Sequence, residues 1–213
     1  AGQQDGRADL LRGLAQQAVA RLARRGLQAR AGRAVLPAQG QVADAARRVV
    51  RIPTIVLVDG RSGAGKSTFA DLLSGRLGLA ALVRLDDVYP GWDGLSAGAE
   101  TVRERVLIPL REGAPGAWPT WNWTADRPSG RERRVDPAPM VIVEGAGVLT
   151  PASAALADVT VWMDAPRDAR RSRALERDGE TYRPHWERWE RQEVAHVREH
   201  DPQGLAQFVL ALP

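Results

Sequence analysis

The sequence contains no cysteine, one lysine and one asparagine. Without cysteine the chain can form neither a disulfide bond nor a metal site with thiolate ligands, so we expect a protein of the reducing cytoplasm. Apolar runs are short as well. None approaches the ~20 residues that a helix needs to cross a membrane, and no apolar signal segment opens the chain. We therefore expect no membrane partner.

Positive charge is unevenly distributed along the chain. Residues 1–50 hold nine arginines and three aspartates, whereas the remainder is slightly acidic. We predict that residues 1–50 form a basic, mostly helical extension, with one helix over residues 7–25 and a shorter one from Val42 to Val50. Gly32 and Pro37 are expected to interrupt the segment between them.

This arginine-rich extension suggests either an arm for nucleic acid or an amphipathic helix packed on the domain or on a second subunit. No aromatic residue lies among the arginines, so nucleic-acid bases have no surface to stack on, and we favour the packed helix. A homodimer formed through this segment is an alternative. The remaining residues, 51–213, are long enough to form one domain with a sizeable core.

A glycine-rich loop lies near the start of this domain, between a predicted strand and a predicted helix. Residues 54–58 read T-I-V-L-V, which is typical of a buried strand, and Phe69, Leu72 and Leu73 share one face of the helix that follows. Between them, residues 60–67 fit the pattern G-x-x-x-x-G-K-[ST]. Such a loop curls its backbone N–H groups around a phosphate at the N-terminus of a helix.

The loop predicts ATP and Mg²⁺ as cofactors. Lys66, the only lysine, would reach the β- and γ-phosphates, and the Ser67 hydroxyl would bind Mg²⁺. A compact ammonium fits a narrow phosphate site better than a planar guanidinium does. The residues expected to hold the nucleotide are Gly60, Arg61, Ser62, Gly63, Ala64, Gly65, Lys66, Ser67 and Thr68. The guanine-recognition motif N-K-x-D is excluded, because Asn122, the only asparagine, precedes a tryptophan.

Two predicted strands end in carboxylates. Residues 80–85 read as a buried strand followed by Asp86 and Asp87, and residues 140–145 read as a strand that ends at Glu144. Ligands of open α/β sheets bind beyond the carboxyl ends of the strands. One aspartate of the pair would accept the proton of an attacking hydroxyl, and Glu144 would hold Mg²⁺ through a water. The alternative for the aspartates is a turn with helix-capping side chains.

Three tryptophans lie within six residues, at positions 118, 121 and 123. Their large flat side chains could form a wall for a substrate ring, and we favour this interpretation. The alternative is a packed β-hairpin in which Trp121–Thr124 pairs with Arg133–Val135.

Residues 167–177 carry five arginines on one predicted helix. Spacings of three and four place Arg170, Arg173 and Arg177 on one face. In phosphoryl transfer such a helix serves as a lid whose guanidiniums neutralise the β- and γ-phosphates. We therefore predict catalytic roles for Arg170 and Arg173 and nucleotide binding by Arg177. The alternative is a solvated helix that pairs with its own acidic residues.

The rest of the chain alternates strands and helices. Helices are predicted over residues 99–112, 148–157 and 186–199, and strands over 159–163 and 205–212. Pro109 should kink or end the first of these helices. The order predicts an α/β fold of three layers, α/β/α, with five parallel strands in a doubly wound sheet. His196 and His200 lie one turn apart, but a metal site at this pair is the less favoured interpretation.

These motifs resemble the uridine kinase and phosphoribulokinase-like branch of the P-loop kinases, over roughly residues 53–180. The loop V-D-G-R-S-G-A-G-K-S-T matches the phosphate loop of that branch, V-I-V-E-G its strand V-x-x-E-G, and L-D-D-V-Y its segment D-[DS]-F-Y. The spacing R-x-x-R-x-x-x-R, followed by Asp178, is similar to its lid helix. The resemblance implies a P-loop kinase fold with a lid helix and a small substrate-binding hairpin, and it makes Asp86 the catalytic carboxylate.

The resemblance departs from the family at the substrate. The segment P-T-W-N-W-T-A-D-R stands where uridine kinases have P-x-Y-D-F followed by His and Arg. Trp121, Asn122 and Asp126 replace the tyrosine, the aspartate and the histidine, so uridine as substrate is not implied. The residues expected at the acceptor are Asp87, Tyr89, Trp121, Asn122, Trp123, Asp126 and Arg127.

We therefore expect an ATP-dependent kinase that phosphorylates a hydroxyl of a small molecule, such as a nucleoside, a sugar derivative or a specialised metabolite. A nucleoside monophosphate kinase is an alternative, because Arg127, Arg131, Arg133 and Arg134 could hold an acceptor phosphate. A P-loop ATPase or nucleotide switch without a small-molecule acceptor is a further alternative.

Overall fold

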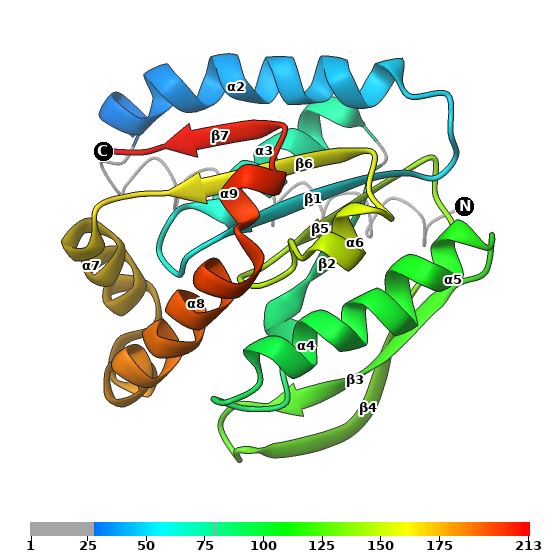
Figure 1. Ribbon diagram of the computed structural model, residues 1–213. Coiled ribbons are helices and arrows are strands. Elements are labelled where there is room, and N and C mark those ends of the chain that lie inside the picture. The colour runs from blue at the N-terminus through cyan, green and yellow to red at the C-terminus, as the bar shows by residue number, and fades with distance from the viewer. Residues whose placement is uncertain (1–27, 79) are drawn as a thin grey trace, which may run out of the picture.

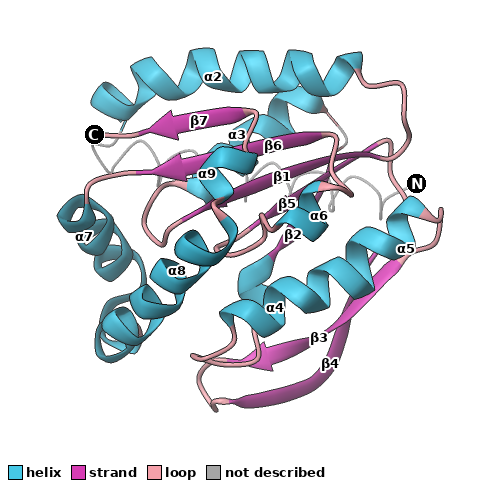
Figure 2. Cartoon of the chain, viewed as in Figure 1, coloured by secondary structure: helices cyan, strands magenta, loops and turns pink. Residues whose placement is uncertain are grey.

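The computed structural model describes residues 28–78 and 80–213 (Figure 1). The helix expected over residues 7–25 lies outside these residues. The described chain forms three layers, in which a sheet lies between two layers of helices (Figure 2), as the sequence predicts. None of the described helices combines the length and the apolar character that a membrane span requires.

Five parallel strands form the central sheet. From one edge to the other they are β2 (Ala81–Arg84), β5 (Met140–Glu144), β1 (Thr54–Gly60), β6 (Val159–Asp164) and β7 (Phe208–Ala211). The central strand β1 is buried along its whole length, as its apolar sequence predicts. The strand β2 was expected to be buried, but it is only half-buried, because it lies at the edge of the sheet with β5 as its one neighbour.

The side chains of β1 alternate between two cores, one on each face of the sheet. Ile55 and Leu57 face one core, and Val56 and Val58 face the other. The second core is covered by α2 (Gln28–Arg48) and α3 (Lys66–Leu77). The elements that contribute to the first are α4 (Leu95–Val102), η2 (Arg103–Leu107), α5 (Ile108–Arg111), α6 (Pro151–Ala154), α7 (Arg167–Asp178), α8 (Trp186–His200) and α9 (Pro202–Leu205).

Helix α2 runs without interruption through Gly32 and Pro37, so the predicted break and the separate short helix from Val42 are wrong. Val42, Ala43 and Ala46 are fully buried in the same core as the side chains of α3. Burial of this face offsets the ~3 kcal/mol that a proline inside a helix costs. Part of the expected N-terminal extension therefore packs directly on the domain.

The helix predicted over residues 99–112 begins earlier, at Leu95, and is not ended by Pro109. A π-helical turn, η2, joins α4 to α5, and the Ile108 N–H bonds to the carbonyl of Arg103, five residues back. Pro109 then lies in the first turn of α5. Because proline has no N–H to donate to the previous turn, the helix widens before it and continues.

Strands β3 (Gly116–Asn122) and β4 (Arg127–Val135) form an antiparallel hairpin apart from the main sheet. The hairpin is as expected, but its predicted register is wrong, because Trp121 pairs with Pro128, and Arg133 pairs with Trp118. Asp126 in the connecting turn adopts a left-handed φ of 45°, which aspartate tolerates. The turn is tight, so pairing between the two strands begins closer to the tip of the hairpin than the sequence pattern indicates.

The helix predicted over residues 148–157 is replaced by an extended loop and the short helix α6, which is capped by Thr150. The N–H groups of Gly147 and Leu149 donate to the Asp59 carboxylate. This tertiary contact holds the loop extended, so a helix forms only after it.

Helices α7 and α8 form as predicted, and the fifth strand is present but shorter than the predicted range 205–212, because β7 begins only at Phe208, after the short helix α9. Beyond β7, the Leu212 N–H donates to the carbonyl of Asp164 at 2.9 Å. The Leu212 side chain lies beside Gly65 of the glycine loop. The end of the described chain therefore supports the loop that follows its first strand.

Asp59, the last side chain of β1 before the glycine loop, is fully buried. Its Oδ1 accepts the N–H groups of Gly60 and Gly147 at 2.6 and 2.9 Å, and its Oδ2 accepts the N–H of Leu149 at 2.8 Å. His196 Nε2 of α8 lies 3.0 Å from Oδ2. One carboxylate thus ties β1, the loop after β5 and helix α8 together.

We predict that Asp59→Asn lowers the free energy of unfolding by roughly 2–5 kcal/mol, because an amide has one acceptor oxygen and its NH₂ group would face some of the donors. Urea denaturation followed by circular dichroism measures the change. Asp44→Asn is the control, since Asp44 forms an exposed pair with Arg47 at 3.5 Å and its loss should cost under about 0.5 kcal/mol. Equal midpoints for the two variants would contradict the role of Asp59.

Candidate active site

The glycine loop leaves β1 at Gly60 and enters α3 at Lys66, as predicted. Gly63 and Gly65 have φ of +77° and +92°, a conformation that favours glycine. A Cβ on Gly63 would also collide with the carbonyl oxygen of Arg170. Among the described residues no side chain caps α3, so its first N–H groups are left for an anion at the positive end of the helix dipole.

Lys66 is nearly buried, and its Nζ donates to the Arg61 carbonyl within the loop at 3.2 Å. Burial raises the pKa of Glu144 and of Glu193, and the Lys66 ammonium opposes both rises. The single ammonium therefore acts electrostatically on two buried carboxylates that come from different parts of the chain.

The carboxyl ends of β2 and β5 bring the two predicted acidic sites together. Glu144 is buried and lies 3.3 Å from Nη1 of Arg84, while Asp86 is exposed in the 3-10 turn η1 (Leu85–Asp87). After burial, the negative charge of Asp86 raises the pKa of Glu144 further, and the Ser67 side chain lowers it. The structure thus gathers Lys66, Ser67, Asp86 and Glu144 in one neighbourhood.

The oxygen atoms of Ser67 and Glu144 suit Mg²⁺, which prefers oxygen ligands and usually binds one or two protein groups together with phosphates and water. In the part of the chain that the structure describes, no group of three or more His, Cys, Asp or Glu side chains could hold a metal. His196 is engaged with Asp59 instead. A cation at Glu144 would share this carboxylate with the guanidinium of Arg84.

The hairpin contacts the turn that carries Asp86 and Asp87. Trp123 Nε1 donates to the backbone carbonyl of Asp86 at 3.0 Å, and Arg133 Nη1 lies 2.6 Å from the carboxylate of Asp87. The Asp87 carboxylate is therefore paired, whereas that of Asp86 has no ion-pair partner within residues 28–78 and 80–213. This difference favours Asp86 as the carboxylate available to an acceptor.

Other predicted acceptor residues shape the tip of the hairpin. Trp121 Nε1 donates to the Asp126 carboxylate at 3.3 Å, and the Asn122 side chain accepts the N–H of Ala125 at 3.0 Å. Arg127 is exposed beside them. The side chains of Trp121 and Trp123 are half-buried, so each keeps part of its ring surface accessible.

Tyr89, expected at the acceptor, lies in the core instead. Its hydroxyl donates to the Ala146 carbonyl at 2.8 Å, and its ring meets the edge of Trp189 with 4.8 Å between centroids. The turn after β2 points this side chain inward, and burial raises its pKa. The predicted contact of Tyr89 with substrate is therefore wrong in this structure.

Sequence reasoning missed Trp92, which lies in the loop after Tyr89. Its ring stacks on His185 with 4.2 Å between centroids and an interplanar angle of 9°, and it meets Trp123 at 4.8 Å. Tyr182 stacks on it at 5.5 Å. Residues from three separate segments thus form one aromatic cluster beside the hairpin. A tryptophan so soon after the Asp86–Asp87 pair was the available signal.

Arg170 is 1% exposed, so the expectation that its guanidinium lies on an accessible face of a lid helix is wrong. Its Nε donates to the Ala165 carbonyl at 3.1 Å and its Nη1 to the Ser62 carbonyl at 3.3 Å. Carboxylates of Asp164, Glu190 and Glu193 surround the guanidinium at 3.4–3.8 Å. Helix α8 packs over Arg170 and excludes it from solvent, which the spacing of arginines along α7 alone does not reveal.

The other two lid candidates differ from Arg170. Arg173 is half-buried, its Nε donates to the Ala169 carbonyl at 3.1 Å, and its Nη2 is buried without a hydrogen-bond partner among the described residues. Burial, with the positive charge of Arg170, lowers the pKa of Arg173. Arg177 is exposed and pairs with Asp178 at 2.7 Å. Of the three arginines expected on the lid face, only Arg173 has a guanidinium nitrogen that is buried without a hydrogen-bond partner in the described residues.

Among the other residues expected to hold the nucleotide, Ala64 is buried and Thr68 is exposed on the first turn of α3. Arg61 Nε lies 4.0 Å from Asp164, and the Ser62 N–H donates to Glu193 at 2.6 Å. Sequence reasoning also missed Asp59 and Glu193. A charged residue inside an apolar strand was a signal for Asp59, whereas nothing distinguishes Glu193 from other acidic residues of α8.

No family model matches the chain. Solved structures that resemble it include two that are named as kinases. A possible uridine kinase from Bacillus stearothermophilus is 17% identical with a TM-score of 0.62, and the match covers 83% of this chain and 98% of that one. A provisionally named fructose transport system kinase from Silicibacter sp. TM1040 is 19% identical with a TM-score of 0.54, and the match covers 84% and 98%. At these identities the likeness establishes the fold, and the described chain has the fold of the P-loop kinases.

Proposed function

We propose that the chain is an ATP-dependent phosphotransferase that moves the γ-phosphate of ATP to a hydroxyl of a small molecule. The observation that carries the proposal is the meeting of Lys66, Ser67, Asp86 and Glu144 beyond the carboxyl ends of β1, β2 and β5. A cation, a hydroxyl and two carboxylates beside uncapped helix N–H groups are the groups that Mg²⁺-dependent phosphoryl transfer uses.

In this proposal the loop N–H groups and Lys66 hold the β- and γ-phosphates. Ser67 and Glu144 would hold Mg²⁺, which supplies positive charge to the phosphate oxygens. The buried Nη2 of Arg173, which has no partner in the described residues, supports an additional anion contact. A desolvated guanidinium gains most from an ionised acceptor such as a phosphate oxygen.

Asp86 orients the acceptor hydroxyl and takes its proton. The acceptor oxygen bonds to the γ-phosphorus as the bond from that phosphorus to the β–γ bridging oxygen breaks, and ADP leaves. We assign this role to Asp86 because Asp87 is already paired with Arg133. The Trp123 hydrogen bond to the Asp86 carbonyl would hold the turn in place as the acceptor binds.

The aromatic cluster around Trp92 and Trp123 favours an acceptor with a flat or apolar face. A second candidate is an acceptor that already carries a phosphate. Arg127 and Arg131 of β4 support it, because both are exposed and neither has a carboxylate partner among the described residues. Magnesium-dependent ADP release, screened over nucleosides, nucleoside monophosphates, sugars, vitamins and amino alcohols, separates the two candidates. Turnover that no added compound stimulates would favour an ATPase.

We predict that Lys66→Arg lowers kcat/KM by roughly 100-fold or more, although it preserves the charge. Lys66 is nearly buried against the loop carbonyl of Arg61, and a planar guanidinium is too broad for that position. ADP release with the acceptor found in the screen measures the effect. The control is the opposite exchange, arginine to lysine, at Arg76 on the exposed surface of α3. Arg76→Lys should retain wild-type activity. Wild-type rates in Lys66→Arg would contradict the proposal that the Lys66 ammonium is specifically required.

We predict that Asp86→Asn lowers kcat by about 10²–10⁴-fold, because an amide cannot take the proton of the acceptor. The dissociation constant for MgATP, measured by calorimetry, should stay within about threefold, since Asp86 contacts the acceptor rather than the phosphates. Asp87→Asn tests the alternative assignment and should have the smaller effect on kcat. The reverse order of the two variants would transfer the role to Asp87.

A further inference from the structure

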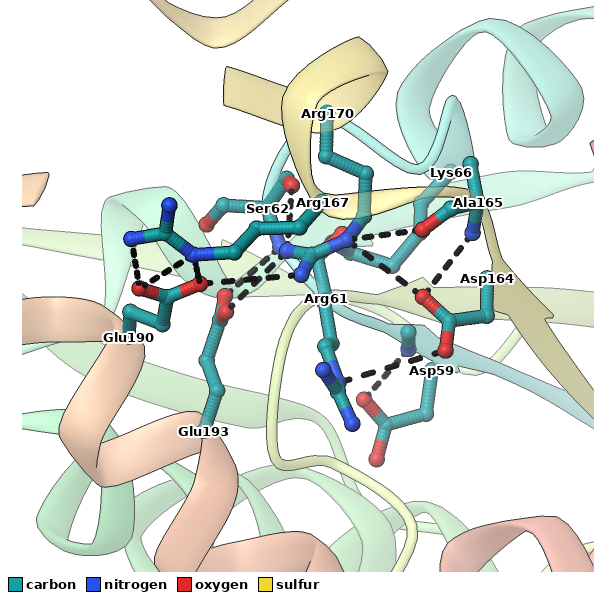
Figure 3. Close-up of polar contacts among 11 residues, drawn as sticks. Asp59, Arg61, Ser62, Lys66, Asp164, Ala165, Arg167, Arg170, Glu190 and Glu193 are labelled. Atoms are coloured by element: carbon teal, nitrogen blue, oxygen red, sulfur yellow. Dashed lines mark hydrogen bonds and ion pairs between the residues drawn. The ribbon is translucent and has the colours of Figure 1, made fainter. Parts of the chain in front are cut away.

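Ser62, in the middle of the glycine loop, is held on both sides by buried charged groups (Figure 3). Its N–H donates to Glu193 Oε1 of α8 at 2.6 Å, and its carbonyl accepts Nη1 of Arg170 of α7 at 3.3 Å. The same Nη1 lies 3.7 Å from Glu193 Oε2. Ser62, Glu193 and Arg170 therefore form a closed triangle, with one corner on the loop and one on each of two helices.

The Glu193 carboxylate of this triangle is costly to keep charged, because it is buried. Glu193 is 2% exposed, and its Oε2 has no hydrogen-bond partner in the described part of the chain. Burial raises the pKa of Glu193, which reflects the cost of keeping the carboxylate charged there. A buried ion pair is weak evidence for stability, because desolvation offsets much of the attraction. Its position against the glycine loop points to a functional reason for the charge.

A carboxylate is the side chain that both neighbours of Glu193 require. The Ser62 N–H donates to one oxygen of the Glu193 carboxylate, and the Arg170 guanidinium forms an ion pair with the other at 3.7 Å, so a negatively charged oxygen faces each neighbour. A glutamine of the same shape could satisfy one of them and would turn its NH₂ group toward the other. The contact thus depends on the charge and symmetry of the carboxylate and not only on its size.

Two further contacts and one electrostatic interaction link helices α7 and α8 to the loop. The Arg170 carbonyl lies so close to Gly63 that a Cβ there would collide with it. His196, on the same helix as Glu193, contacts Asp59 at the start of the loop. Lys66 at the end of the loop acts electrostatically on Glu193. The loop is therefore supported from outside at its start and its middle.

We infer that Glu193 is a positioning residue of the nucleotide site. It fixes the Ser62 peptide and, through Arg170, the Ser62–Gly63 turn, so that the loop N–H groups are oriented before a triphosphate arrives. Such preorganisation raises affinity because the loop does not have to be ordered on binding. The identity of the ligand as a triphosphate rests on the proposed function, but the geometry of the triangle does not.

The test compares Glu193→Gln with Glu190→Gln. Glu190 lies one turn earlier on α8 and pairs with Arg167 and Arg170, but within the described residues no hydrogen bond or ion pair joins it to the glycine loop. Calorimetric titration with MgATP should give a dissociation constant roughly tenfold higher for Glu193→Gln, the scale of one hydrogen bond to a charged group. The constant for Glu190→Gln should remain within about twofold of wild type. In both variants the number of sites per chain should stay the same.

A merely structural role predicts a different result, in which fewer chains bind MgATP and those that do bind it with wild-type affinity. That result, or equal affinity in both variants, would overturn the inference. Nuclear magnetic resonance of the wild-type chain gives a second measurement that does not depend on how well a variant folds. The Ser62 amide proton should be shifted downfield and exchange slowly with solvent. Fast exchange at Ser62 would overturn the inference as well.

These outcomes are separable from those of the proposed function. The titration needs no acceptor, so a chain that binds MgATP but phosphorylates none of the compounds screened would refute the phosphotransferase and leave the role of Glu193 intact. A wild-type chain without measurable affinity for MgATP would overturn both.

Discussion

The buried carboxylate of Asp59 is the interaction on which the rest of the site depends. Three backbone N–H groups and one imidazole nitrogen converge on it from β1, the loop after β5 and helix α8. A carboxylate without exposure to water is tolerable only when such donors replace its hydration. Because they come from segments far apart in the sequence, satisfying this one charge fixes the relative positions of the glycine loop, the strand that carries Glu144 and the helix that carries Glu193.

Charge around the glycine loop is organised about a single ammonium. Lys66 opposes the rise in pKa that burial produces at both Glu144 and Glu193, so one cation favours the charged form of two carboxylates. Arg170 shares in the second of these interactions from the opposite side. Two arginines of α7 therefore have different surroundings. Arg170 supports the glycine loop, whereas Arg173 has a guanidinium nitrogen without a hydrogen-bond partner in the described structure. One sequence pattern thus covers two physical roles.

Local patterns predicted what local forces determine. The β-branched run of β1, the glycine loop and the acidic ends of β2 and β5 were all placed from the sequence, because strand burial and loop geometry depend on neighbouring residues. Pro37 and Pro109 misled the prediction, since core packing and a π-helical turn compensated for the missing N–H. Tyr89 and Arg170 were misplaced for a related reason, because the burial of both side chains depends on α8. Tyr89 packs on Trp189, 100 residues further along the chain, and Arg170 pairs with Glu190, 20 residues further along. These residues come together with α8 only in the folded chain.

The arrangement of the C-terminal segment has a consequence for how the molecule is made. Glu193 and His196 reach back to Ser62 and Asp59, and Leu212 lies beside Gly65 after β7 has joined the sheet. Synthesis proceeds from the N-terminus, and segments fold as they emerge. The glycine loop therefore leaves the ribosome long before its supports do. Until residues 193–212 have followed, a nascent chain carries the glycine loop without the groups that shape it.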